Sequence, residues 1–293
     1  MPLLWLTIQA LAGLLFSKAV ALDLPKYEGL VTSQNNSILT ITLHNPVSSV
    51  NAWSADMHAG MKDIVRRLQE DNETKVVIIN SSVPRFFCNH FDPAVFAIAN
   101  FTEDYAMLMM NITNLPQITI GAVEGRARNA GHELLLALDM RFATTKDVLI
   151  GETETAFGNF PVAGSCQHLP RLIGRGLAME YILSSQDVDA KEAERIGWIN
   201  KAFDSRRDMY SHIDKLTSRL ALFPRSGLVA SKQAINLRSK PSREDFLHDI
   251  TLFQDLSNPD FARIVDRVAT LTNNWTAGEV ELNLGRDVVL AYN

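Results

Sequence analysis

Strands and helices alternate through the first two thirds of the chain, and this alternation limits the possible folds more than any other feature. Residues 75–80 (KVVIIN) and 117–123 are continuous apolar runs of strand length. Such runs are typical of strands in a parallel sheet that helices cover on both faces. Residues 37–43 (SILTITL) instead alternate apolar and polar side chains, as a half-buried strand does. The pattern predicts βαβ units and a mostly parallel sheet, which is an α/β fold.

Caps and periodicity predict the remaining elements of this part. Ser54 can cap a helix whose apolar residues between Met57 and Leu68 recur on one stripe. We also expect strands at 30–33 and 140–144 and helices at 102–115 and 131–138.

From Gly164 onward almost every segment has helical features, and Pro224, Pro241 and Pro259 mark boundaries between the segments. The expected helices are 176–185, 190–196, 206–222, 227–237, 245–256 and 259–271. We therefore predict a core at 22–200 and a helical C-terminal region at 201–293. That region either serves in oligomerisation or covers the active site.

The first 21 residues have the features of a signal peptide. Residues 3–16 are uncharged and apolar, and Ala19-Val20-Ala21 suits a signal peptidase. The apolar run is short for a bilayer span, so no stable span is expected after removal of the leader. A lumenal route would expose six N-x-S/T sequons, at Asn35, Asn72, Asn80, Asn100, Asn111 and Asn274. The leader predicts the secretory pathway or an extracellular protein; if it is not functional, the cytoplasm or an organelle is expected.

Charge and cysteine content exclude several classes of protein. A net charge of −5 and a pI near 5.8 argue against a nucleic-acid partner. Cys88 and Cys166 are too few for a disulfide scaffold, and whether they pair is left open. The histidines show no metal-ligand spacing with them, so no metal site is expected.

Two segments that follow apolar strands are candidates for a ligand site. Residues 85–92 come directly after the 75–80 strand, at the sheet edge where open α/β folds place ligands. Residues 125–133 link a strand to a helix through small residues, which let the backbone approach a ligand. Glu133 lies in the first turn of that helix.

A third segment, 150–154, carries two carboxylates, and a glycine- and proline-rich loop follows it at 158–164. Glu152 and Glu154 are two residues apart, so they point to opposite sides if the segment is extended. One of them is then expected to face a pocket and the other to face water.

Together these segments resemble the crotonase superfamily of enoyl-CoA hydratases and isomerases. Residues 85–92 are similar to its K/R-x-F-x-x-G-x-D turn, residues 122–139 to its A-V-N-G-x-x-x-G-G-G-x-E-L stretch, and residues 150–164 to its F-G-x-P-E stretch. The resemblance implies a spiral of ββα units with a C-terminal helical region. It also implies a homotrimer or a dimer of trimers.

The resemblance further implies a mechanism based on an enolate. The backbone N–H groups of Phe91 and Ala130 would form an oxyanion hole, and Glu133 and Glu154 would be the acid/base pair. CoA would enter as part of the substrate, with no separate cofactor. The other expected contacts with the substrate or its CoA are Arg85, Phe87, Asn89, His90, Asp92 and Arg128.

The chain also departs from the family pattern. Asn89-His90-Phe91 stands where the family has a small A-G-A run, and Asn129-Ala130 replaces two glycines. These changes alter the expected shape of the pocket and leave the acid/base pair in place.

Hydration or double-bond isomerisation of an enoyl-CoA thioester is the leading function. One alternative is a CoA-independent C–C hydrolase or isomerase that acts on a small carbonyl compound in a secondary pathway. Another is a secreted, non-catalytic binding protein of the same fold. The leader and a CoA substrate conflict, because CoA esters belong to the cytosol, mitochondria and peroxisomes.

Overall fold

The computed structural model describes residues 21–293, so residues 1–20 of the expected leader lie outside the described residues. Within the described part, no helix combines the length and the apolar character that crossing a membrane requires.

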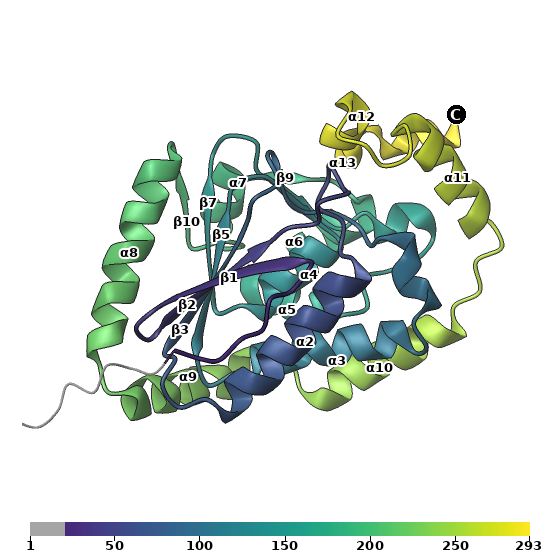
Figure 1. The fold of residues 1–293 in the computed structure, drawn as a ribbon. Coiled ribbons are helices and arrows are strands. Elements are labelled where there is room, and N and C mark those ends of the chain that lie inside the picture. The colour runs from purple at the N-terminus through teal and green to yellow at the C-terminus, as the bar shows by residue number, and fades with distance from the viewer. Residues whose placement is uncertain (1–20) are drawn as a thin grey trace, which may run out of the picture.

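A twisted, mostly parallel sheet is the larger of two sheets in residues 21–293 (Figure 1). β1 pairs antiparallel with β2, and every other pairing in this sheet is parallel. The predicted α/β fold is therefore confirmed. The strand order is β1-β2-β3-β5-β7-β10, with bounds Leu30–Asn35, Ile38–Leu43, Val76–Ser81, Ile118–Val123, Met140–Thr144 and Lys201–Phe203.

A smaller sheet lies beside it and follows the order β4-β6-β8-β9 within the described residues. Each turn of the chain gives one strand to the large sheet and the next to the small one, as in β3–β4, β5–β6 and β7–β8. This is the spiral that the resemblance implied. The bounds are Phe86–Cys88, Arg126–Arg128, Leu149–Gly151 and Val188–Asp189. The sequence does not predict the first two of these strands.

Helices cover both faces of the large sheet. α8 (Arg206–Leu222) buries Met209 and Ile213 against one face. α2 (Ala55–Glu70) and α3 (Phe101–Thr113) pack on the other side, and Ser54 caps α2 as predicted. α4 (Ala130–Ala137) lies between the two sheets, and all of its residues are buried. Apart from His132 and Glu133, its residues are apolar or glycine, which suits that central place, and α4 carries these two side chains into the core.

The remaining helices form the second half of the chain. α5, α6 and α7 complete the core, with bounds Ser165–Ile173, Arg175–Ser184 and Ala190–Arg195. α9 and α10 follow at Arg225–Ser239 and Arg243–Asp255, and α10 contacts α3. α11, α12 and α13 then turn back over the ends of the small-sheet strands (Figure 1), with bounds Phe261–Leu271, Glu279–Leu282 and Leu284–Asp287. The 3₁₀ helices η1, η2 and η3 span Pro93–Ala97, Glu154–Phe157 and Val288–Tyr292.

Candidate active site

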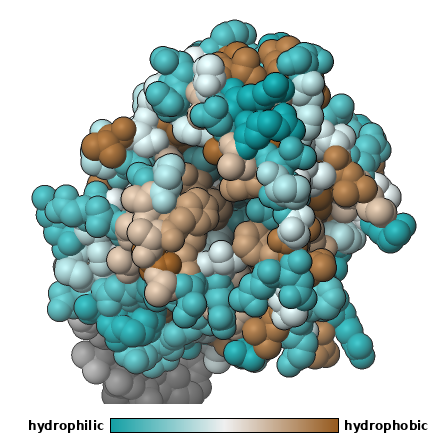
Figure 2. Space-filling model, turned by 90° about the vertical axis from the view of Figure 1, so that its right-hand side faces the viewer, coloured by the Kyte–Doolittle hydropathy of each residue, from teal (hydrophilic) through white to brown (hydrophobic). Residues whose placement is uncertain are grey.

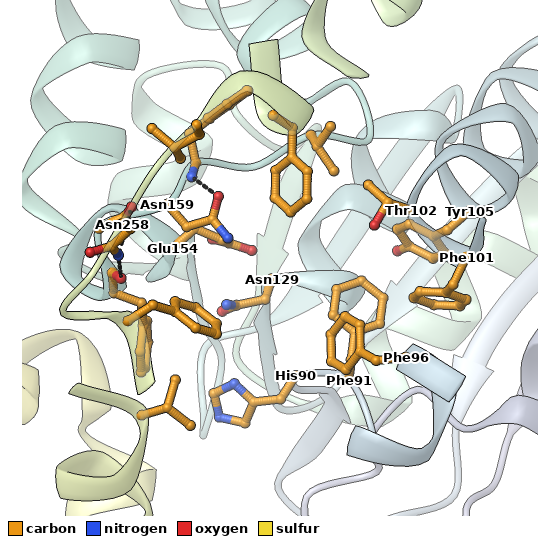
Figure 3. Close-up of a pocket in the computed structure, with 18 of the residues that line it drawn as sticks. His90, Phe91, Phe96, Phe101, Thr102, Tyr105, Asn129, Glu154, Asn159 and Asn258 are labelled. Atoms are coloured by element: carbon orange, nitrogen blue, oxygen red, sulfur yellow. Dashed lines mark hydrogen bonds between the residues drawn. The ribbon is translucent and has the colours of Figure 1, made fainter. Parts of the chain in front are cut away.

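A cavity of about 630 Å³ opens between the core and the C-terminal helices. Figure 2 shows apolar side chains gathered around a hollow in this face of the molecule. Most lining residues are aromatic or aliphatic, and the lining within residues 21–293 contains no lysine or arginine. Glu133, Glu154 and Asn129 provide polar groups on the core side of the cavity, and Figure 3 shows Glu154 and Asn129 there.

Glu133 reaches the cavity from the first turn of α4. Its side chain is buried, and its Oε1 accepts a hydrogen bond from the Ala163 N–H at 2.8 Å. Burial, and next the nearby charge of Glu154, raises the pKa of Glu133 to about 8. The backbone donors of Ala163 and Val162 oppose this rise, because they stabilise the carboxylate.

Glu154 reaches the same cavity from the start of η2. Burial, followed by the charge of Glu152, raises the pKa of Glu154 well above its usual value. Its Oε2 is sealed from solvent and has no hydrogen-bond donor within the described residues. Burial and the missing donor therefore favour the protonated form of Glu154.

The expectation that one of Glu152 and Glu154 faces water is wrong. Glu152 is 2% exposed and lies behind Glu154, with its carboxyl bonded to Ser165 and His132. The two side chains do not diverge because the strand β8 ends at Gly151 and η2 begins at Glu154. The extended geometry that the prediction assumed is therefore absent between them.

The two expected oxyanion donors, Phe91 and Ala130, have a common backbone feature. Each follows a residue with positive φ: His90 at 59° precedes Phe91, and Asn129 at 50° precedes Ala130. Neither N–H has an acceptor among residues 21–293. The family pattern has glycine before these donors, and here side-chain residues keep the left-handed backbone.

Gly131 sets how closely the start of α4 approaches the end of β4. A Cβ at this position would lie 2.0 Å from the carbonyl oxygen of Cys88. Only glycine allows the first turn of α4 to pack directly on β4. The start of α4 and the loop after β4 are thereby held against each other.

His90 and Phe91, the two bulky residues of the loop after β4, turn toward the cavity (Figure 3). The Phe91 ring meets Phe101 and Tyr105 edge-on, with centroids 5.5 and 4.9 Å apart. Tyr105 in turn donates from its hydroxyl to the Ala130 carbonyl at 3.0 Å. The aromatic group therefore narrows the cavity and also braces the start of α4.

Five of the six expected substrate contacts lie outside the cavity lining, namely Arg128 and four further residues. Phe87 is fully buried in the core. Asn89 accepts from the Arg128 N–H and donates to Glu281, and Asp92 caps η1. Arg85 is half-exposed at the surface and pairs with Asp147.

Arg128 is buried behind the cavity, and its guanidinium is fully paired. It donates to both carboxylate oxygens of Asp187 at 2.7 Å and to the Glu281 carbonyl at 2.9 Å. A substrate has no access to this group, so the structure does not support the expected contact with Arg128. Its partners come from distant parts of the chain, which the local sequence around Arg128 does not reveal.

The C-terminal helices supply lining residues that sequence analysis did not identify. They are Phe253, Leu256, Asn258, Phe261, Val265 and Trp275. Glu281 on α12 is also new: it accepts hydrogen bonds from Asn89 Nδ2 at 2.9 Å and pairs with His90 Nε2 at 2.8 Å. This contact ties the end of the chain to the loop that carries the Phe91 N–H.

Cys88 and Cys166 are both free thiols. Within residues 21–293, no cluster of His, Cys, Asp and Glu has the arrangement of a metal site.

Comparisons with known proteins agree with this geometry. A model of the enoyl-CoA hydratase/isomerase family matches residues 33–264. A Bacillus subtilis protein, named as a candidate enoyl-CoA hydratase/isomerase, is 32% identical over 213 residues, which cover 70% of this chain and 79% of that protein. Human mitochondrial methylglutaconyl-CoA hydratase is 31% identical over 212 residues, 69% of this chain and 62% of that protein.

The fold comparison gives the same result. The crystal structure of a candidate enoyl-CoA hydratase from Streptomyces avermitilis superposes with a TM-score of 0.83 at 32% identity, covering 90% of this chain and 97% of that one. The match thus includes most of the helical C-terminal region as well as the spiral core. The chain belongs to the enoyl-CoA hydratase/isomerase family.

Proposed function

We propose that this enzyme hydrates the double bond of an enoyl thioester. The observation that carries the proposal is the convergence of Glu133 and Glu154 on one cavity, beside two backbone N–H groups that have no acceptor in the described part of the chain. Hydration builds negative charge on the thioester oxygen while water adds at Cβ and a proton adds at Cα. Phe91 and Ala130 would stabilise that oxygen, each donor contributing roughly 3 kcal/mol in comparable sites.

The two carboxyl groups suit different roles. Glu133 receives backbone donors that stabilise its carboxylate, and a pKa of about 8 leaves part of it ionised near neutral pH, so it is the group suited to accept a proton from the attacking water. Glu154 has an unpartnered oxygen and a second carboxyl beside it, so it is the group suited to donate a proton to Cα.

The cavity favours an uncharged acyl group. Its lining is largely aromatic and holds two carboxyl groups, and the described residues contribute no lysine or arginine to it. An acyl group with a free carboxylate, as in the methylglutaconyl group of one relative's name, would be repelled here. We therefore propose an apolar enoyl group as the substrate.

The test follows the absorbance of the conjugated double bond with short, long and aromatic enoyl-CoA thioesters. Loss of turnover by roughly 10²-fold or more in both Glu133→Gln and Glu154→Gln supports hydration. Loss in Glu154→Gln alone supports isomerisation, which needs one proton shuttle. Absence of turnover on every thioester, together with activity on a free carbonyl compound, would reject the thioester.

We also propose that the protein enters the secretory pathway and carries glycans. Asn72, Asn100 and Asn274 are exposed, whereas Asn80 lies in β3 and donates its Nδ2 to Tyr210 at 3.2 Å. A glycan on Asn80 Nδ2 would displace its hydrogen bond to Tyr210, so we expect Asn80 to stay unmodified in the folded protein. The mature N-terminus and the glycan mass after expression in secretory cells test this; an uncleaved, unglycosylated chain would contradict it.

The homotrimer or dimer of trimers also remains a proposal. Leu222, Ile235 and Leu237 are large apolar side chains that α8 and α9 leave exposed, and burial by another subunit would remove them from water. Light scattering on the purified protein tests this, and a monomer at micromolar concentration would reject it.

A further inference from the structure

Glu152 is a buried carboxyl for which the proposed hydration has no use. It is absent from the cavity lining. The carboxyl groups of Glu152 and Glu154 are within hydrogen-bonding reach of each other. The Oε2 atoms of both groups are sealed from solvent, and neither receives a hydrogen bond from an N–H or hydroxyl donor in the described chain. Two carboxyl groups this close in a buried site do not both ionise, so the pair holds a proton.

The other oxygen of Glu152 is bonded on the side away from the cavity. Its Oε1 accepts from Ser165 Oγ and from His132 Nδ1, the latter at 2.6 Å. His132 Nε2 accepts from Trp198 Nε1 at 2.7 Å, which places the imidazole proton on Nδ1. An indole N–H only donates, so this chain of bonds ends in the core. It offers Glu152 no route for losing a proton to solvent, and Glu154 is the neighbour left for exchange.

We propose that Glu152 is a positioning residue that holds one proton jointly with Glu154 and keeps Glu154 ready to act as the acid. The proposal rests on the hydration proposed above. His132 and Ser165 both donate to Glu152, so they favour the negative charge there and the shared proton on Glu154. In each turnover Glu154 gives this proton to Cα, while Glu133 takes one from the attacking water. Glu133 then releases its proton to water in the cavity, and the pair takes one back.

Other titratable groups face the pair from α3, α4 and α5. Burial raises the pKa of Tyr105 on α3 and of Cys166 on α5, so both stay neutral. Burial, and secondarily the charge of Arg141, lowers the pKa of His132 on α4 to about 3, so its ring is also neutral. Glu133 on α4 is therefore the neighbour whose charge changes, and the test must separate it from the pair.

The first test compares pH profiles of kcat for wild type, Glu152→Gln and Ser165→Ala. The amide of Glu152→Gln can donate to Glu154 and stabilise its anion. On the alkaline side of the profile, the basic limb, kcat declines because the acid loses its proton. In Glu152→Gln this limb moves to lower pH by about one unit, so kcat at pH 8 falls about tenfold. Ser165→Ala removes a donor from Glu152 and makes double ionisation harder, so the same limb moves up.

Opposite shifts in the two variants distinguish this role from a structural one. A loss of packing would lower kcat in both variants without moving the limb in opposite directions. Asp249→Asn is the matched control, because Asp249 is a buried carboxyl that Gln167 binds outside the cavity lining. Its pH profile is expected to match that of the wild type.

The second test reads the shared proton without a substrate, from the infrared band of protonated carboxyl groups. In Glu133→Gln at neutral pH, we expect a band that is lost when Glu154→Gln is added. The band should titrate at lower pH when Glu152→Gln is added instead. Absence of the band in Glu133→Gln, or coinciding pH profiles of wild type and Glu152→Gln, would overturn the proposal even in an active hydratase. A band that behaves as expected in a protein with no thioester activity would reject the hydration and leave the shared proton standing.

Two of these measurements stand without Glu152→Gln, in case that variant does not fold. An upward shift of the limb in Ser165→Ala, with the band present in Glu133→Gln, supports the shared proton. An unmoved limb together with a missing band rejects it.

Discussion

The two walls of the cavity are built in different ways. The core wall, formed by Asn129, Glu133 and Glu154 with Tyr105, belongs to the spiral, and Asn129, Glu133 and Tyr105 each make a hydrogen bond inside the protein. The cover consists of apolar side chains from the C-terminal helices: Phe253, Leu256, Phe261, Val265 and Trp275. Leu256 and Phe261 are more than 40% exposed. The core wall is therefore ordered by many contacts, and the cover by few.

The difference separates chemistry from substrate choice. Proton transfer needs groups placed within hydrogen-bond distance of the reacting atoms, which a rigid wall provides. An apolar cover contributes area and shape, and these affect binding more than the chemical step. Changes in the core wall should therefore act on kcat, and changes in the cover on KM.

Glu133→Gln tests the core wall and has the largest expected effect. We expect kcat to fall by roughly 10²- to 10⁴-fold, because the water loses its base. The raised pKa of Glu133 also has a consequence for stability. As pH rises from about 4.5 to about 8, the unfolded chain ionises this group while the folded protein keeps it neutral. The free energy of unfolding of the wild type then falls by about 1.4 kcal/mol per unit of pKa shift.

Glutamine does not ionise, so the free energy of unfolding of Glu133→Gln does not fall with pH through this group. Urea unfolding at pH 5 and pH 8 should therefore show Glu133→Gln gaining stability over the wild type as pH rises, by a few kcal/mol. Asp249→Asn is again the control for a buried carboxyl elsewhere. A constant stability difference across this range would show that Glu133 is ionised in the folded protein.

Glu281 joins the cover to the core, and Glu281→Ala has the next largest effect. The substitution leaves Arg128 with one buried carboxylate fewer and removes the partner of His90. Breaking a buried charged cluster in this way costs about 3 kcal/mol or more. We expect that loss in urea unfolding, together with faster proteolysis of residues 258–293 and a lower kcat.

The matched control is Glu279→Ala, a substitution two residues earlier at an exposed position of α12, which removes only a side-chain bond to Asn283. Its stability should stay within about 0.5 kcal/mol of the wild type. Equal losses in the two variants would mean that the cover is not held through Glu281.

The contrast between the core wall and the cover also explains which features the sequence could predict. The core wall comes from segments that are short and local, so the resemblance of their motifs to the crotonase superfamily predicted Glu133 and Glu154 as a pair. Periodicity and caps predicted the approximate bounds of most strands and helices. α8 occupies the predicted residues 206–222 because its apolar stripe and its cap, Ser205, are local signals. The fold and the family followed from such signals.

The contacts between distant segments could not be predicted. Glu281 meets Asn89 across 192 residues, and Arg128 meets Asp187 across 59. Neither partner has a local signature, so Arg128 was expected at the substrate and Glu281 was not expected at all. Glu152 was missed for another reason: the chain leaves the extended conformation just after Gly151.

Phe253→Ala tests the cover and should act mainly on binding. Phe253 packs against Phe160 with ring centroids 6.1 Å apart, on the C-terminal side of the cavity. Removing a partly exposed ring at a binding surface costs about 1–2 kcal/mol of affinity. We expect KM for long or aromatic enoyl thioesters to rise about tenfold with kcat changed by less than about twofold. A loss in kcat with unchanged KM would show that the cover takes part in chemistry.

His90→Gly has the smallest expected effect, because a relief of backbone strain offsets part of the stability that the substitution removes. Glycine relieves a left-handed backbone that costs about 1 kcal/mol or more with a side chain. The substitution also removes the hydrogen bond to Glu281, which contributes about 1.5–3 kcal/mol. It further adds roughly 0.5–1 kcal/mol of chain entropy to unfolding.

The hydrogen bond and the chain entropy together exceed the relief of strain, so urea unfolding should show His90→Gly less stable by about 1–2 kcal/mol. The His90 ring also packs against Trp275 of the cover, with centroids 4.8 Å apart, so its loss widens the cavity. Bulky thioesters should therefore gain relative to short ones, with kcat on short ones preserved because glycine keeps the Phe91 N–H in place. A more stable variant would mean that strain outweighs the Glu281 bond, and the cover would then be held by its apolar contacts alone.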